Sequence, residues 1–100
     1  MASSKLFTPL TLGGKNPIEL EHRVVMAPLG RLRYEDSGIP KPIAAEYYGQ
    51  RATQGGLIIA EATNVGAKGR GFFGSSGIFT QEQVVGWKRV TDAIHDKGGK

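Results

Sequence analysis

Two short apolar runs that lack polar alternation constrain the fold of this chain most strongly. Residues 23–27 read RVVMA and residues 57–62 read LIIAEA. Runs of this length that are rich in β-branched residues are typical of strands buried on both faces. Such strands occur mainly in parallel sheets whose faces are covered by helices. The two runs therefore predict an α/β fold built on a parallel sheet or barrel.

A first helix is predicted over residues 42–54, between the two runs. It starts with a proline, which suits a first helical position, and it ends before Gly55 and Gly56. Tyr47 and Tyr48 on this helix are expected to be packing residues.

A second helix is predicted over residues 81–97. Its start has the spacing of a capping box, in which the Thr80 oxygen accepts the Gln83 N–H while the Gln83 side chain reaches back. An apolar face recurs at helical spacing along it and comprises Val84, Trp87, Val90 or Thr91, and Ile94.

A hairpin is predicted ahead of these elements. Residues 10–12 and 18–20 alternate apolar and polar side chains, and the turn-forming segment 13–17 (GGKNP) separates them. Two short strands are not stable alone in water, so the hairpin should cap something larger. Two parallel strands also need neighbours, so we expect the chain to be the start of a larger domain. The alternative is a complete small α/β module.

Composition excludes several functional classes. The chain has 13 basic and 9 acidic residues, and their scatter indicates a solvated surface rather than a nucleic-acid site. It has no cysteine, which excludes disulfides and thiolate zinc sites, and His22 and His95 are too far apart to suggest a metal site. No apolar run approaches the roughly 20 residues of a membrane span, and the N-terminus has no secretory signal. A cytoplasmic protein without a membrane or nucleic-acid partner is therefore expected.

Glycine is unusually frequent, with 15 among 100 residues, and six lie between residues 66 and 86. Such a segment is either a flexible loop or one that must approach another group closely. Its glycines do not follow the order of the dinucleotide-binding fingerprint, so no NAD-binding Rossmann unit is predicted. Lys68 and Arg70 could contact a cofactor phosphate, but a solvated loop is favoured for both.

Five motifs, taken together and in order, resemble one known family. They are residues 6–10 (LFTPL), 22–31 (HRVVMAPLGR), 46–52 (EYYGQRA), 57–63 (LIIAEAT), and 77–80 (GIFT) leading to 83–88 (QVVGWK). Over residues 5–100 the chain resembles the N-terminal part of the Old Yellow Enzyme family. These FMN-dependent ene-reductases include the 12-oxophytodienoate reductases.

The resemblance implies a (β/α)8 TIM barrel of which this chain is an incomplete part. Residues 5–20 would form the capping hairpin, 23–54 the first βα unit and 57–97 the second. It also implies an oxidoreductase in which NAD(P)H reduces FMN, and the flavin then reduces the C=C bond of an α,β-unsaturated carbonyl compound. The alternative is a non-catalytic truncated fragment that is inactive without the rest of the barrel.

Site residues follow from the resemblance because barrel active sites lie at the carboxyl ends of strands. The expected FMN-binding residues are Ala27, Pro28, Leu29, Gly30 and Ala62. Family members often carry threonine or cysteine in place of Gly30, so altered redox tuning is expected here. Phe72 would contact substrate, or equally would be an aromatic anchored on the barrel rim. The residues that bind the substrate carbonyl and donate the proton lie later in the family pattern, so no catalytic residue is expected in this chain.

Three charged side chains near these strand ends have open roles. Arg31 and Arg33 would lie near the flavin edge, although an ion pair with Glu35 or Glu46 is favoured for them. Glu61 interrupts an apolar strand, so it should be paired or lie at an exposed strand end, and a general-acid role is not favoured.

Overall fold

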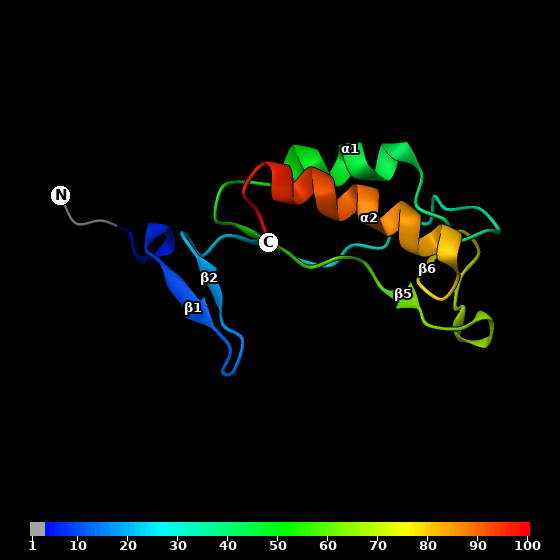
Figure 1. Cartoon of the computed structure of the whole chain (residues 1–100), viewed down its shortest axis with the longest axis horizontal. Helices are drawn as coiled ribbons and strands as arrows, with labels where there is room; N and C mark the ends of the chain where they lie inside the picture. The colour runs from blue at the N-terminus through cyan, green and yellow to red at the C-terminus, as the bar shows by residue number, and fades with distance from the viewer. Residues whose placement is uncertain (1–3) are drawn as a thin grey trace.

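Two helices lie side by side and run in the same direction over a pair of short parallel strands (Figure 1). The computed structural model describes residues 4–100. The helices are α1 (Pro42–Arg51) and α2 (Gln81–Asp96), and the strands are β3 (Val25–Met26) and β4 (Leu57–Ile58). Val25 pairs with Leu57 and Met26 with Ile58 in parallel register, which confirms the predicted parallel arrangement.

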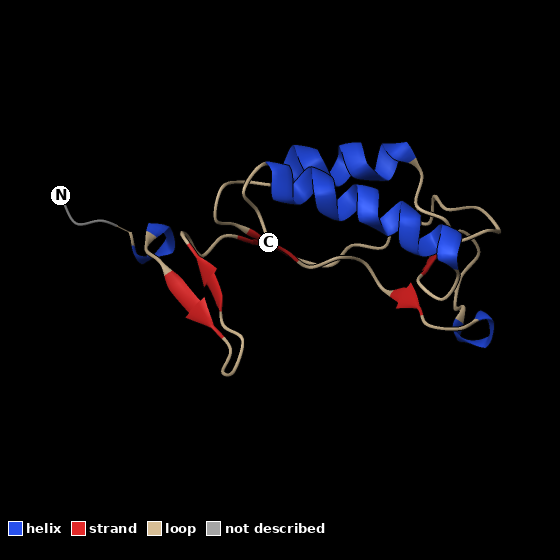
Figure 2. Cartoon of the chain, viewed as in Figure 1, coloured by secondary structure: helices blue, strands red, loops and turns tan. Residues whose placement is uncertain are grey.

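The predicted hairpin forms at one end of the molecule, beyond the helices (Figure 2). A 3-10 turn, η1 (Lys5–Phe7), precedes β1 (Leu10–Leu12) and β2 (Ile18–Leu20), which pair antiparallel. The Glu21 N–H donates to the Gly55 carbonyl at 3.0 Å, and the Arg23 N–H donates to the Leu6 carbonyl at 2.8 Å. These bonds fasten the hairpin to the amino ends of β3 and β4, opposite the edge where the strands end.

The strands are shorter and more exposed than the apolar runs predict. Met26 and Ile58 pack against the core beneath the helices. Val25 is 40% exposed and Ile59 is 47% exposed. The prediction of burial on both faces is therefore wrong for the described chain, because its helices cover one face of the strand pair and leave the other open.

The last residue already lies alongside β4. The Lys100 N–H donates to the Gly56 carbonyl at 2.8 Å, and the Ile58 N–H donates to the Lys100 carbonyl at 2.9 Å. This alternation is the hydrogen-bond pattern of a parallel neighbour.

The core forms where the two helices meet each other and the segment before α1. Its buried members are Tyr34, Ala44, Tyr48, Ala52, Trp87, Val90 and Ile94. The predicted apolar face of α2 is confirmed at its last three positions. Val84 is 44% exposed, and the neighbouring Gln83 is buried instead, so the prediction for Val84 is wrong.

The capping box of α2 is present as predicted. Thr80 Oγ1 accepts the Gln83 N–H at 3.2 Å, and Gln83 Oε1 accepts the Thr80 N–H at 3.1 Å. The buried Gln83 amide is satisfied, because its Nε2 also donates to the Ser37 carbonyl at 3.0 Å. Helix α1 ends at Arg51, three residues earlier than predicted, because Ala52 is already extended (φ −72°, ψ 139°).

A third strand pair was not predicted. Strands β5 (Thr63–Asn64) and β6 (Ser76–Gly77) are parallel and flank the 3-10 turn η2 (Ala67–Gly69). Thr63 Oγ1 and Ser76 Oγ lie 3.0 Å apart between them. The pairing of β5 with β6 holds the two ends of the glycine-rich segment together, so this segment is not an open loop.

Candidate cofactor site at the strand ends

The five predicted cofactor residues lie at the carboxyl ends of the two parallel strands. Ala27, Pro28, Leu29 and Gly30 follow β3, Ala62 follows β4, and all five are exposed. The Ile59 N–H donates to the Met26 carbonyl at 3.0 Å, so the two strand ends lie side by side. The chain therefore offers a surface of small or apolar side chains at this edge, which we call the strand-end ledge.

Two backbone N–H groups of the strand-end ledge are available to a ligand. Among residues 4–100, neither the Leu29 nor the Gly30 N–H donates to a protein acceptor. A Cβ placed on Gly30 would meet no atom within 4 Å. A flat, uncharged ring with acceptor atoms along its edge suits such a surface, because backbone N–H groups need partners when they are covered. The residues present thus fit a flavin.

A buried carboxylate lies directly behind the ledge. Glu61 is only 4% exposed. Its Oε2 accepts the hydroxyl hydrogens of Tyr34 at 2.5 Å and Tyr48 at 2.7 Å, and its Oε1 accepts the Arg31 N–H at 3.2 Å. The Tyr48 hydroxyl also accepts the Glu61 N–H at 3.3 Å. The prediction that Glu61 is paired is confirmed, but its partners are hydroxyls and an amide rather than a cation.

Both tyrosines are set up to act as donors. Burial, followed by the hydrogen bond to Glu61, raises the pKa of Tyr34 and of Tyr48 above the ordinary value of about 10 for a tyrosine hydroxyl. The hydroxyls therefore stay protonated to higher pH than an ordinary tyrosine and donate hydrogen bonds to the carboxylate. Tyr48 is a packing residue, as predicted, and a hydrogen-bonding one as well.

The arginines after β3 do not form the predicted ion pairs. Glu35 pairs with Lys41, and within residues 4–100 neither Arg31 nor Arg33 pairs with an acidic side chain. The Arg31 guanidinium lies 4.5 Å from the centre of the Tyr47 ring instead. An aromatic face is a favourable partner for a guanidinium, so Arg31 is held without a carboxylate.

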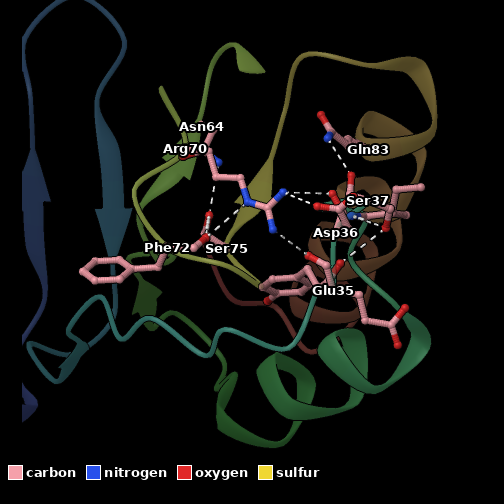
Figure 3. Close-up of polar contacts among 10 residues, drawn as sticks. Glu35, Asp36, Ser37, Asn64, Arg70, Phe72, Ser75 and Gln83 are labelled. Atoms are coloured by element: carbon pink, nitrogen blue, oxygen red, sulfur yellow. Dashed lines mark hydrogen bonds and ion pairs between the residues drawn. The ribbon is translucent and has the colours of Figure 1, made fainter. Parts of the chain in front are cut away.

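Arg70 fastens the glycine-rich segment to the segment after β3. Its guanidinium forms an ion pair with Asp36 at 2.6 Å and donates to the Asp36 carbonyl at 3.3 Å, the Glu35 carbonyl at 3.5 Å and the Phe72 carbonyl at 3.4 Å (Figure 3). The prediction of a solvated Arg70 is therefore wrong, whereas Lys68 is exposed. Phe72 is 72% exposed beside this cluster, so its ring is available to a ligand, and its contact with substrate stays a prediction.

Residues 4–100 contain no group of three or more His, Cys, Asp or Glu side chains placed to hold a metal ion. His22 contacts Thr53, with Nε2 and Oγ1 2.9 Å apart. None of the helices in that range has the length and apolar character to cross a membrane.

Comparison with known proteins decides the lineage. The sequence profile of the NADH:flavin oxidoreductase / NADH oxidase family matches residues 5–100. The chain belongs to this family. The resemblance to the Old Yellow Enzymes is thereby confirmed over all but the first four residues.

The relatives are much longer than this chain. An NADP-dependent oxidoreductase of Aspergillus flavus is 51% identical over 96 residues, which cover 95% of this chain and 25% of the relative. The 12-oxophytodienoate reductase 1 of Oryza sativa subsp. japonica is 48% identical over 97 residues, which cover 97% of this chain and 24% of the relative. The structure of morphinone reductase in complex with tetrahydroNAD superposes with a TM-score of 0.86 at 47% identity, covering 98% of this chain and 26% of that one. The chain thus spans about a quarter of these family members.

Of the three side chains that meet behind the ledge in this family member, the sequence predicts a role for Glu61 and Tyr48 but none for Tyr34. Tyr34 is 2% exposed and donates to Glu61. The signal for it was Glu61 itself, because a carboxylate in an apolar strand requires donors from elsewhere in the chain. The nearby tyrosines are the neutral side chains able to provide them.

Proposed function

We propose that this chain forms the capping hairpin and the first two βα units of a (β/α)8 barrel enzyme. The enzyme binds FMN at the carboxyl ends of its strands and uses NAD(P)H to reduce the C=C bond of α,β-unsaturated carbonyl compounds. The observation that carries the proposal is the strand-end ledge, with its exposed small or apolar side chains and with the N–H groups of Leu29 and Gly30, which have no acceptor among residues 4–100.

The residues of the ledge have separate roles in this proposal. The N–H groups of Leu29 and Gly30 would donate to the flavin edge, and Ala27, Pro28 and Ala62 would support the ring without steric conflict. FMN supplies the hydride-accepting and hydride-donating chemistry when bound. Phe72 would lie on the substrate side and restrict the access of water. The names of the relatives support NAD(P)H and a small activated alkene as partners.

The test measures FMN binding by two proteins. The first is the chain itself, and the second is a chimera in which residues 5–100 replace the matching segment of morphinone reductase. We expect the chimera to be yellow, to quench flavin fluorescence and to oxidise NAD(P)H in the presence of a cyclic enone. A folded chimera that retains no FMN, while morphinone reductase prepared in parallel does, would overturn the proposal.

A second candidate function concerns the isolated chain. Its strand pair leaves one apolar face open, with Val25 40% and Ile59 47% exposed. This observation favours a non-catalytic fragment that needs the remaining barrel as a partner. FMN binding by the chimera but not by the chain would support this reading, and turnover by the chain alone would contradict it.

Replacing Gly30 with threonine in the chimera should raise the flavin midpoint potential. The site has room for the side chain, since a Cβ there meets nothing within 4 Å. A hydroxyl that donates to a flavin carbonyl stabilises the reduced ring, and a hydrogen bond worth about 0.5–1.5 kcal/mol corresponds to roughly 10–30 mV for a two-electron couple. Spectroelectrochemical titration measures the change. An unaltered potential would count against the placement of Gly30 at the flavin.

A further inference from the structure

The buried Glu61 carboxylate connects three separate parts of the chain. It follows β4 itself, and it accepts hydrogens from the segment after β3 through Arg31 and Tyr34 and from helix α1 through Tyr48. Burying a carboxylate is unfavourable, and a well-packed apolar group in its place is often no less stable. The stability of the chain therefore does not by itself require a carboxylate at this position. What the carboxylate uniquely provides is one rigid acceptor for three converging donors.

The backbone that Glu61 holds is strained. Leu32 has a φ of +56°, a left-handed conformation that leucine rarely adopts. Hydrogen bonds hold the backbone on either side of Leu32. The Arg31 N–H donates to Glu61, and the Tyr34 N–H donates to the Gly74 carbonyl at 2.9 Å. Strained backbone of this kind persists only where its surroundings hold it, and it clusters at ligand sites.

The strained segment begins at the ledge. Arg31 directly follows Gly30, whose N–H has no acceptor among residues 4–100. We propose that Glu61 is a positioning residue for the flavin: its bond to the Arg31 N–H fixes the direction of the Leu29 and Gly30 N–H groups toward the ring. This inference rests on the proposed function, and it assigns to Glu61 no proton transfer.

Glu61→Gln in the FMN-binding chimera tests the inference. Glutamine keeps the size of the side chain but offers one neutral oxygen in place of two carboxylate oxygens. If that oxygen faces the hydroxyls, the NH2 opposes the Arg31 N–H and this bond is lost. If it faces Arg31, it accepts more weakly than a carboxylate, and the two hydroxyls must turn to accept from the NH2. We expect the dissociation constant for FMN to rise about tenfold and the visible absorption band of the bound flavin to shift. Glu19→Gln, an exposed glutamate in the hairpin, is the matched control and should change neither.

Two tyrosine variants separate positioning from packing. Tyr34→Phe and Tyr48→Phe each remove one hydroxyl and leave the Arg31 bond to Oε1 in place. We expect each to weaken FMN binding by less than about threefold, with the flavin spectrum unchanged, and to lower the unfolding midpoint. If Glu61→Gln does not fold, Glu61→Asp serves in its place, because a carboxylate one methylene shorter cannot reach the Arg31 N–H and both hydroxyls together.

The outcomes are distinct. A glutamate variant with wild-type FMN affinity and spectrum but reduced stability would show a purely structural role and overturn the inference. Tyrosine variants that disturb the flavin as strongly as Glu61→Gln would overturn the route through Arg31. A wild-type chimera without FMN would instead refute the proposed function, and the inference with it.

Discussion

Replacing Gly74 with alanine should destabilise the chain by about 3 kcal/mol. Gly74 has a φ of +84°, which costs a residue with a side chain about 1–2 kcal/mol. A Cβ there would lie 2.4 Å from the Leu32 carbonyl oxygen and 2.9 Å from its carbon, and such overlap with backbone adds roughly 1–3 kcal/mol. Both penalties apply at the point where the glycine-rich segment meets the strained turn behind the ledge.

Urea unfolding followed by tryptophan fluorescence measures this effect. Trp87 is the single tryptophan and is buried in the core, so its emission reports the folded state. Gly71→Ala is the matched control in the same segment, because a Cβ there meets nothing within 4 Å and its φ is not positive. Its free energy of unfolding should change by less than about 0.5 kcal/mol. Equal stability of the two variants would show that the close approach of Gly74 to Leu32 does not exist in solution.

The elements that sequence predicted well are those encoded locally. The Thr80 and Gln83 capping box depends on residues three positions apart, and both of its hydrogen bonds form. The order of hairpin, strand, helix, strand and helix follows from periodicities within single segments. Parallel pairing of β3 with β4 then follows, because a helix between two strands returns the chain to the end of the sheet at which the first strand began.

The features that sequence missed depend on contacts between distant segments. Arg70 meets Asp36 across 34 positions, and Tyr34 meets Glu61 across 27. Neither pair has a spacing that distinguishes it from solvated side chains. The predicted burial of Val25 was wrong for a related reason. An apolar run indicates that a strand is suited to two covered faces, but a covering layer comes from elsewhere, and the described residues supply it on one face only.

A glycine pair in the two helices gives a prediction in which the same substitution has opposite effects. Alanine is favoured over glycine inside a helix by about 1 kcal/mol. At Gly49 in α1, a Cβ would lie 3.5 Å from the Ala93 Cβ, an ordinary contact, so Gly49→Ala should stabilise the chain by about 1 kcal/mol. At Gly86 in α2, a Cβ would lie 2.7 Å from the Pro40 carbonyl oxygen and 2.8 Å from Pro40 Cδ.

The Gly86→Ala overlap cannot be relieved by a rotamer change, since its nearest partner is backbone oxygen and Pro40 is fully buried. Overpacking of about 1–3 kcal/mol therefore outweighs the gain of about 1 kcal/mol in helix propensity, and we expect a net loss of about 1 kcal/mol. Urea unfolding of the two variants, side by side, should place their free energies of unfolding about 2 kcal/mol apart, with Gly49→Ala the more stable. Stabilisation by both changes would mean that α2 does not rest on the segment before α1.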